Sequence, residues 1–393
     1  STTDDQSFVL GGLTPVTSGT GYYTFELNPT DSGIEDANGG PLDAGASTSW
    51  AMGRSELRLI VDTLVDEADG DLDDGDISLR DALAAAAPGE LIDFDASLDG
   101  GTILLTLGEL SIDRSLQIDA TALAGGLTLD ASGNDPTPQL DDGLGSRIFS
   151  IDDRRAATDS LATLRGLTLT GGDASGDGGA IHARDSLALE QSTVTDNATQ
   201  NRGGGIFGSH VALDHSNLSQ NRADREGGGV FAHHVDVTSS TLSDNAASNA
   251  EERNYFDSFG GGAISAVSAT SSGSTISGNS ADFGAGIAAT SVTVTSSQIA
   301  DNSAAPDSFK YSGRGGGIAG EDVSIVASQI INNSSREQGG GVSAFGNLTV
   351  TDSIISGNSA SNGDGGGLQG DIVEVTSSTI SHNSARWSGG GVT

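Results

Sequence analysis

The chain has 393 residues and a formal net charge of −37 at pH 7, with 17 basic residues and no cysteine. An acidic chain without a basic stripe is unsuited to nucleic acid and to an anionic membrane surface, and we exclude both as partners. We expect no membrane span, because no apolar run reaches about 18 residues, and no disulfides. The length suits one long solenoid with a small additional unit.

Residues 1–54 differ in composition from the rest and are predicted to form a strand-rich leader. Residues 22–27 read as a strand, and residues 36–42 have the composition of a turn. The layout Y-x-F-x-L followed by I-x-D-A-N-G-x-P-L resembles the last strands of bacterial Ig-like domains. The resemblance implies that the leader is a remnant of such a domain, since about fifty residues are too few for a whole sandwich.

Residues 55–90 are predicted to form an N-terminal cap. Residues 59–63 read as a strand, and an acidic loop over residues 66–76 leads into the run I-S-L-R-D-A-L. Ser78 can cap a short helix, and Asp81 can complete a capping box. The run resembles the CSLREA motif of bacterial surface β-helix proteins, with Ile in place of Cys and Asp in place of Glu. That motif opens the β-helix in its family, so the resemblance implies a cap over the first coil.

The acidic loop has a D-x-D-x-D spacing that is typical of calcium ligands. Its carboxylates are those of Asp69, Asp71, Asp73 and Asp76. Calcium prefers such oxygen ligands, although the glycine falls one position late for an EF-hand-like loop. Two interpretations stay open, a calcium site and a solvated loop. No cofactor is required by either.

Residues 91–393 are predicted to form the main unit, with irregular strands up to residue 170 and a regular array over residues 178–393. Glycine runs begin at Gly178, Gly203, Gly227, Gly260, Gly284, Gly315, Gly339, Gly365 and Gly389. Each of the first eight is followed by an asparagine, at Asn197, Asn221, Asn245, Asn279, Asn302, Asn333, Asn358 and Asn383. The asparagines are 24, 24, 34, 23, 31, 25 and 25 residues apart. Such a period indicates a solenoid with one coil per repeat.

The repeats have the periodicity of strands. Apolar residues alternate with polar ones, as at Val235 and Val237, and β-branched residues dominate. We therefore predict an all-β fold, a parallel β-helix of about 24 residues per coil and a rod about 60 Å long. One predicted interior column is Ile181, Ile206, Val230, Ile264, Ile287, Ile318, Val342 and Leu368. The other is Val194, Leu218, Leu242, Ile276, Ile299, Ile330, Ile355 and Ile380.

The glycine and asparagine positions also carry a resemblance. The G-G-A-I and G-G-G-I/V runs followed by N-x-A resemble the repeats of adhesins of the polymorphic outer-membrane-protein type, which implies a right-handed helix. We predict that the asparagines form a structural ladder at a corner, with amides hydrogen-bonded along the stack. The glycines are predicted to supply positive φ angles or a close approach of backbones.

Two insertions enlarge the same corner of the coil, at residues 250–259 and 305–313. Seven aromatic residues lie at this corner, namely Tyr255, Phe256, Phe259, Phe283, Phe309, Tyr311 and Trp387. Insertions in repeat proteins map to one face, often the binding face. Exposed rings there would anchor a glycan or a protein. The alternative is that the rings fold back against the sheet.

No arrangement typical of catalysis stands out, and no catalytic residue is predicted. The outward column of the V-x-V strand contains two acids, Asp236 and Glu374, which are too distant for a hydrolase pair. His210 and His234 should stack, with Asp214 or Asp236 as the nearest further metal ligand. Outward polar residues are the simpler interpretation of these histidines.

We therefore expect a non-catalytic structural or adhesive segment, a stalk or adhesin, of a larger secreted or cell-surface protein. Its partner would be a glycan, a matrix component or a sister molecule. The sequence stops inside a coil, which predicts a longer polypeptide or another molecule over the open edge. Two alternatives stay open, a polysaccharide lyase or hydrolase of the β-helix class, and an extracellular filament subunit that associates end to end.

Overall fold

The computed structural model describes residues 2–4, 7–8, 21–27, 46–52, 58–72, 75–155, 160–248, 260–304 and 313–393. The chain forms two compact units, Ser1–Arg58 and Leu59–Thr393. The first contains two antiparallel strand pairs, β1 (Thr2–Asp4) with β2 (Ser7–Phe8) and β3 (Gly21–Leu27) with β4 (Ala46–Met52). The strand predicted at residues 22–27 is present as β3, whereas the turn predicted at residues 36–42 lies outside the described residues.

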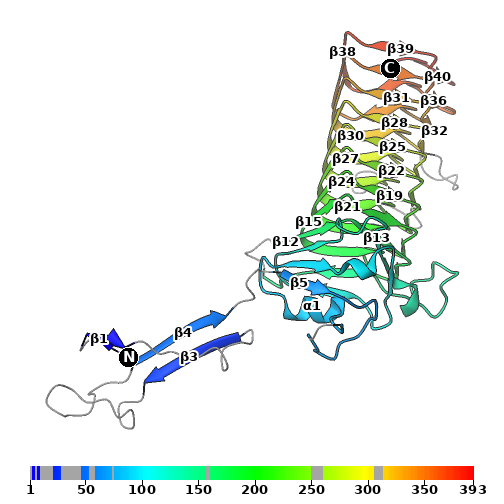
Figure 1. Cartoon of the computed structure of the whole chain (residues 1–393). Coiled ribbons are helices and arrows are strands. Elements are labelled where there is room, and N and C mark those ends of the chain that lie inside the picture. Colours follow the sequence, from blue (N-terminus) through cyan, green and yellow to red (C-terminus); the bar gives the residue numbers. More distant parts are fainter. Residues whose placement is uncertain are drawn as a thin grey trace. The chain divides into compact units, whose positions relative to one another are not determined.

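The second unit is a right-handed parallel β-helix, as predicted. Its coils stack from the short helix α1 (Leu79–Ala85) at one end to β38, β39 and β40 at the other (Figure 1). Three sheets run along the stack, and each strand pairs with the corresponding strand of the neighbouring coil. Two short 3-10 helices, η1 (Ala96–Leu98) and η2 (Ala131–Asn134), lie in the early coils.

The sixteen-stranded sheet contains the long strand of every coil. Its main path is β5 (Arg58–Val61), β6 (Leu91–Phe94), β9 (Leu116–Asp119), β12 (Leu161–Arg165), β15 (Ile181–Glu190), β18 (Ile206–Asp214), β21 (Val230–Thr238), β24 (Ile264–Ser272), β27 (Ile287–Thr295), β30 (Ile318–Val326), β33 (Val342–Ala344) and β37 (Leu368–Gln369). Beside this path lie β8 (Leu110–Ile112), β11 (Phe149–Ile151), β34 (Asn347–Thr351) and β38 (Ile372–Thr376).

The other two sheets are built from shorter strands. The eleven-stranded sheet contains β7 (Thr102–Leu104), β10 (Leu127–Asp130), β13 (Leu167–Thr170), β16 (Thr193–Thr195), β19 (Asn217–Ser219), β22 (Thr241–Ser243), β25 (Thr275–Ser277), β28 (Gln298–Ala300), β31 (Gln329–Ile331), β35 (Ile354–Ser356) and β39 (Thr379–Ser381). The nine-stranded sheet contains β14 (Asp173–Ala174), β17 (Ala198–Thr199), β20 (Arg222–Ala223), β23 (Ala246–Ala247), β26 (Ser280–Ala281), β29 (Ser303–Ala304), β32 (Ser334–Ser335), β36 (Ser359–Ala360) and β40 (Ser384–Ala385).

The interior columns follow from this pairing. Ile206 lies in register with Val230, and Leu218 lies in register with Leu242, from coil to coil along the array. Both predicted columns are confirmed, and their members are fully buried apart from Ile380 in the last coil, which is partly buried. One apolar core therefore runs the length of the unit and leaves every second side chain of each strand outside.

The eight asparagines form one continuous ladder at the corner between the eleven-stranded and the nine-stranded sheet, which we call the second corner. Each Nδ2 donates to the Oδ1 atom of the next asparagine at 2.9–3.0 Å, and the backbone amide donates to the same oxygen. All but the last side chain are buried. The ladder satisfies the polar groups that the corner removes from water.

A second ladder consists of serines and was not predicted. It lies at the first corner, between the sixteen-stranded and the eleven-stranded sheet. Its members are Ser192, Ser216, Ser240, Ser274, Ser297, Ser328, Ser353 and Ser378. Each backbone amide donates to the hydroxyl oxygen of the next serine at 2.9–3.2 Å. Every coil is thus joined to its neighbour by two polar columns as well as by its strands.

Each ladder residue is preceded by a residue in the left-handed backbone region. Asp301, before Asn302, has φ +55°, and Ala327, before Ser328, has φ +49°. Asp, Asn and Gly tolerate this conformation better than other residues and recur at these positions. Glycine is needed at the third corner, where Gly203 has φ +72° and a Cβ at Gly204 would overlap the carbonyl oxygen of Gly228 in the next coil.

The cap helix α1 begins as predicted. The Ser78 hydroxyl accepts the backbone amide of Asp81 at 3.0 Å, and Leu79, Ala82 and Leu83 are buried. The Asp81 carboxylate accepts the Ser78 hydroxyl at 2.7 Å and the Gly70 amide at 3.0 Å, so it also fastens the acidic loop. No helix in the described part of the chain is long and apolar enough to cross a membrane.

Replacing Asn302 by alanine should destabilise the array by about 3 kcal/mol, because buried donors and acceptors of Asn279, Asn333 and Ile276 lose their partner. Thermal and denaturant unfolding would measure the loss. Asn347→Ala is the control, since Asn347 is exposed and its side chain bonds to exposed Asp322. Equal stabilities of the two variants would contradict a stabilising role for the ladder.

Replacing Ala327 by glycine should stabilise the protein by about 1 kcal/mol, because the left-handed conformation costs a residue with a Cβ more than it costs glycine. Ala212→Gly, at an outward strand position of β18, should instead destabilise it by about 0.5–1 kcal/mol. Chemical denaturation of both variants tests the pair. A loss of stability in Ala327→Gly would contradict the assignment of strain to this corner.

Candidate functional site

Two phenylalanines stack on the outside of the sixteen-stranded sheet. Phe207 on β18 and Phe231 on β21 are in register, with ring centroids 5.5 Å apart and an interplanar angle of 5°. His182 on β15 meets the Phe207 ring edge-on at 5.0 Å. Burial and the Arg147 charge lower the pKa of His182, which favours the neutral imidazole in this packing.

A fixed guanidinium group completes this patch. The Arg202 guanidinium carbon lies 5.0 Å from the Phe207 centroid and 4.7 Å from the Phe231 centroid. Asp177 holds it in a bidentate pair, with Nη2 to Oδ2 at 2.8 Å and Nε to Oδ1 at 3.1 Å. Such cation–π contacts are attractive within about 6 Å. We call His182, Arg202, Phe207 and Phe231 the aromatic platform.

The predicted aromatic corner is only partly described. Phe283 is half-buried and stacks on Phe345 at 5.8 Å, with Arg314 5.9 Å from the Phe345 ring centroid, so its contacts are those of local packing. Trp387 is 67% exposed. The other five residues of the predicted face lie outside the described residues, namely Tyr255, Phe256, Phe259, Phe309 and Tyr311.

The predicted calcium loop stays a prediction. Asp69, Asp71 and Asp76 are exposed, and the Asp69 carboxylate accepts the Asp71 amide at 2.9 Å. Asp73 lies outside the described residues. Desolvation and the charges of Asp76 and Asp69 raise the pKa of Glu67, so the carboxylates of this loop repel one another.

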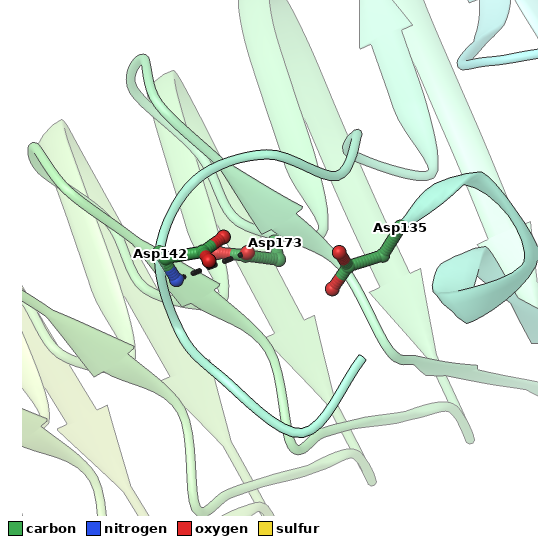
Figure 2. A group of neighbouring side chains, drawn as sticks. All are labelled: Asp135, Asp142 and Asp173. Atoms are coloured by element: carbon green, nitrogen blue, oxygen red, sulfur yellow. Dashed lines mark hydrogen bonds between the residues drawn. The ribbon is translucent and has the colours of Figure 1, made fainter. Parts of the chain in front are cut away.

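Among the described residues, two groups of three carboxylates occur instead in or next to the irregular early coils, and the sequence did not predict either group. The first is Asp135, Asp142 and Asp173 (Figure 2), with oxygen atoms within 4.8 Å of one another. Asp173 is 5% exposed and accepts the amides of Gly143 at 2.8 Å and Asp142 at 3.2 Å. Burial raises the pKa of Asp173, and the negative charge of Asp135 raises it further. The hydrogen bonds from Gly143 and Asp142 oppose this shift.

The second group is Asp152, Asp153 and Asp185. Asp152 and Asp153 begin the loop after β11, and Asp185 lies on β15. Asp185 is 6% exposed and accepts the Asp153 amide at 2.7 Å. The Asp152 carboxylate lies 3.6 Å from Arg184 and accepts the Arg154 amide at 2.8 Å. This group therefore places carboxylates beside the Arg184 side chain.

A third polar group lies on the regular array. The Nε2 atom of His210 is 3.0 Å from Oδ2 of Asp236, and the Thr270 hydroxyl donates to Oδ1 of Asp236 at 2.6 Å. The His234 ring centroid is 6.1 Å from that of His210. Partial burial opposes ionisation, but the hydrogen bonds from Thr270 and His210 hold the pKa of Asp236 below its usual value.

The outward column of the V-x-V strand has the register that the sequence predicts. It contains Ala188, Ala212, Asp236, Thr270, Thr293, Ser324, Thr349 and Glu374. Asp236 and Glu374 are five coils apart, about 24 Å at the usual strand spacing. A glycosidase pair needs about 5–9.5 Å, so this column provides none.

The comparisons with known proteins leave the family open. No protein-family model matches the chain, and no curated protein matches it. Among solved structures, the crystal structure of pectate lyase Pel9A aligns over 87% of this chain and 82% of that chain, with a TM-score of 0.40 and 16% identity. A likeness of this size says nothing about activity. The resemblances to CSLREA-type and outer-membrane-type repeats stay predictions.

The raised pKa of Asp173 predicts a pH dependence of stability. The folded chain binds this proton more tightly than the unfolded chain, so Asp173 lowers the free energy of unfolding as pH rises above about 4. In EDTA, Asp173→Asn should raise the unfolding temperature relative to wild type at pH 7 and lose that advantage at pH 3. Exposed Asp371→Asn is the control. A constant difference between pH 3 and 7 would contradict the shift.

Proposed function

We propose that this chain is a non-catalytic structural or adhesive segment of a secreted or cell-surface protein, which binds a neutral glycan, a matrix component or a sister molecule through the aromatic platform. The observation that carries the proposal is the stacked pair Phe207 and Phe231 with the Arg202 guanidinium fixed by Asp177. Aromatic and arginine side chains are the residues that most often dominate binding energy at interfaces.

The position of the platform supports this role. Its rings are half-buried on strands that two hydrogen-bonded ladders hold in place, so little conformational entropy is left to lose on binding. The next residue of the column after Phe231 is Ser265, so the ring stack ends there. The net charge of −37 disfavours polyanions and favours a neutral partner. Calcium at the loop that contains Asp69 belongs to the same proposal as a stabiliser of the cap.

The alternative, a polysaccharide-cleaving β-helix enzyme, is favoured by one observation. Asp152, Asp153 and Asp185 lie together beside Arg184, so three carboxyl groups and one guanidinium group share one site. Asp185 already accepts the Asp153 amide, and Asp152 accepts the Arg154 amide. Because internal hydrogen bonds account for this geometry, we place the alternative second.

The test is a panel of neutral and acidic polysaccharides, scored for retention of the full chain and for released products. We expect retention on a neutral polysaccharide without products. Phe207→Ala/Phe231→Ala should weaken retention at least about tenfold, since stacked aromatic contacts are lost. Phe283→Ala/Phe345→Ala is the matched control, because it removes the other stacked pair.

Three outcomes contradict the proposal in different ways. Retention that the Phe207/Phe231 variant leaves unchanged would move the binding site elsewhere, and loss in Trp387→Ala would move it to the predicted corner. Released products would establish the enzymatic alternative. A chain that no polysaccharide of the panel retains would refute glycan binding by the platform.

A further inference from the structure

Five of the chain's six histidines lie on three neighbouring coils of the regular array. His210 on β18 and His234 on β21 are in register, with ring centroids 6.1 Å apart, and His233 precedes His234 in the chain. All three are exposed, and we call them the imidazole patch. The other two are His182, which belongs to the aromatic platform, and His215, which lies beyond the end of β18.

One carboxylate shares the outer face with the patch. Oδ2 of Asp236 is 3.0 Å from Nε2 of His210, and the Thr270 hydroxyl donates to Oδ1 of Asp236 at 2.6 Å. Desolvation opposes ionisation of Asp236, but the hydrogen bonds from Thr270 and His210 outweigh it and lower its pKa. Asp236 is therefore an anion throughout the range in which an imidazole titrates.

In the described part of the chain, the neighbouring strands add no net charge next to the patch. β24, on the following coil, contains no charged residue. On the preceding coil, Ser186 of β15 is in register with His210. The charged residues just before Ser186 and in the loop after β11 are three acids and three bases, namely Asp152, Asp153, Asp185, Arg154, Arg155 and Arg184. Asp214 and Glu190, at the far end of these strands, have basic partners of their own.

Acidification therefore reverses the charge of this face. An ordinary imidazole gains its proton near pH 6.5, whereas ordinary carboxylates stay ionised down to about pH 4. Asp236 alone gives the face a formal charge of −1, and three protonated imidazoles beside it change this to +2. Salt screens charges beyond about 8 Å at physiological ionic strength. For a small ligand at the patch, this local charge outweighs the net charge of −37.

The surroundings supply groups that suit an acidic sugar. A protonated imidazole can donate charge-assisted hydrogen bonds to carboxylates through both ring nitrogens. Ser186 and Ser268 flank His210 and His234 in the same column, and serine hydroxyls both donate and accept hydrogen bonds, as sugar hydroxyls do. The face is an open sheet whose coils repeat at about 4.8 Å, so a short chain of sugar units can lie along it.

We propose that the imidazole patch binds a short acidic oligosaccharide, one that carries uronic-acid carboxylates, when the pH falls below about 6. Above that pH the same face repels the ligand, because the Asp236 carboxylate is then uncompensated. The patch is a separate site from the aromatic platform, and the proposal does not depend on the binding of a neutral glycan there.

The test is the affinity of the full chain for a trimer of a uronic acid, measured by calorimetry at about pH 5.5 and pH 7.5 at constant ionic strength. We expect an affinity at least about tenfold higher at the lower pH, and no such change for a neutral trisaccharide. His233→Gln/His234→Gln should abolish the pH dependence, because glutamine takes no proton. His215→Gln is the matched control, since it removes an exposed histidine outside the patch and should keep the full effect.

A second variant separates the role of charge from a folding defect. Asp236→Asn removes the carboxylate that repels the ligand when the imidazoles are neutral. It should therefore raise the affinity at pH 7.5 by about threefold or more, whereas a misfolded chain would lose affinity.

Four results would overturn the proposal. Equal affinity at the two pH values is the first, and a loss in His215→Gln as large as that in the double variant is the second. Inorganic phosphate that displaces the trimer at equal concentration would show a simple anion site in which the sugar has no part. A sedimentation coefficient that rises at pH 5.5 without trimer binding would assign the patch to a second copy of this acidic chain.

Discussion

Every coil of the regular array is fastened to the next by an asparagine whose side-chain oxygen accepts two hydrogen bonds from one neighbour. In the case of Asn333, both the backbone amide and Nδ2 of Asn302 donate to Oδ1. A buried amide without hydrogen-bond partners lowers the stability of the fold. Each coil must therefore place its asparagine directly in line with that of the coil before it. The serine ladder imposes the same condition at the neighbouring corner. The two insertions fall outside both ladders, in the part of the sequence between an asparagine and the next glycine run.

This constraint separates the inside of the solenoid from the outside. Most interior positions keep an aliphatic residue from coil to coil, as between Ile206 and Val230, because a change in volume would leave a void or a clash in the continuous core. Ser271 is an exception, and its hydroxyl donates to the hydroxyl of Ser297 at 3.2 Å. Outward positions vary more in size and polarity from coil to coil. The column that contains Ser150 and His182 continues as the half-buried Phe207 and Phe231 and then as the small, buried residues Ser265 and Ala288. The same backbone thus presents different chemistry at each level of the stack.

The period in the sequence was enough to predict the fold, both interior columns and the corner that holds the asparagines. It did not reveal the serine ladder, because serine is common throughout the chain and its column does not stand out. Phe207 and Phe231 are 24 residues apart, which equals the repeat, but they lie outside the insertions on which the predicted binding face rests, so the sequence analysis does not single them out. Asp135, Asp142 and Asp173 have no common period, so only the folded early coils bring them together.

The exceptions on the outer face are concentrated in the coils of β15, β18 and β21. These coils contain the platform residues Phe207 and Phe231 and the pair His210 and Asp236, whereas later coils have serine, alanine or threonine at most corresponding positions. At the outward positions of His210 and His234 the next two coils have serine, Ser268 and Ser291, so packing alone does not explain the imidazoles. Residues that depart from a repeat without a structural need are where function is expected. The face of these three coils is therefore the part of the solenoid on which partner and ligand should be sought.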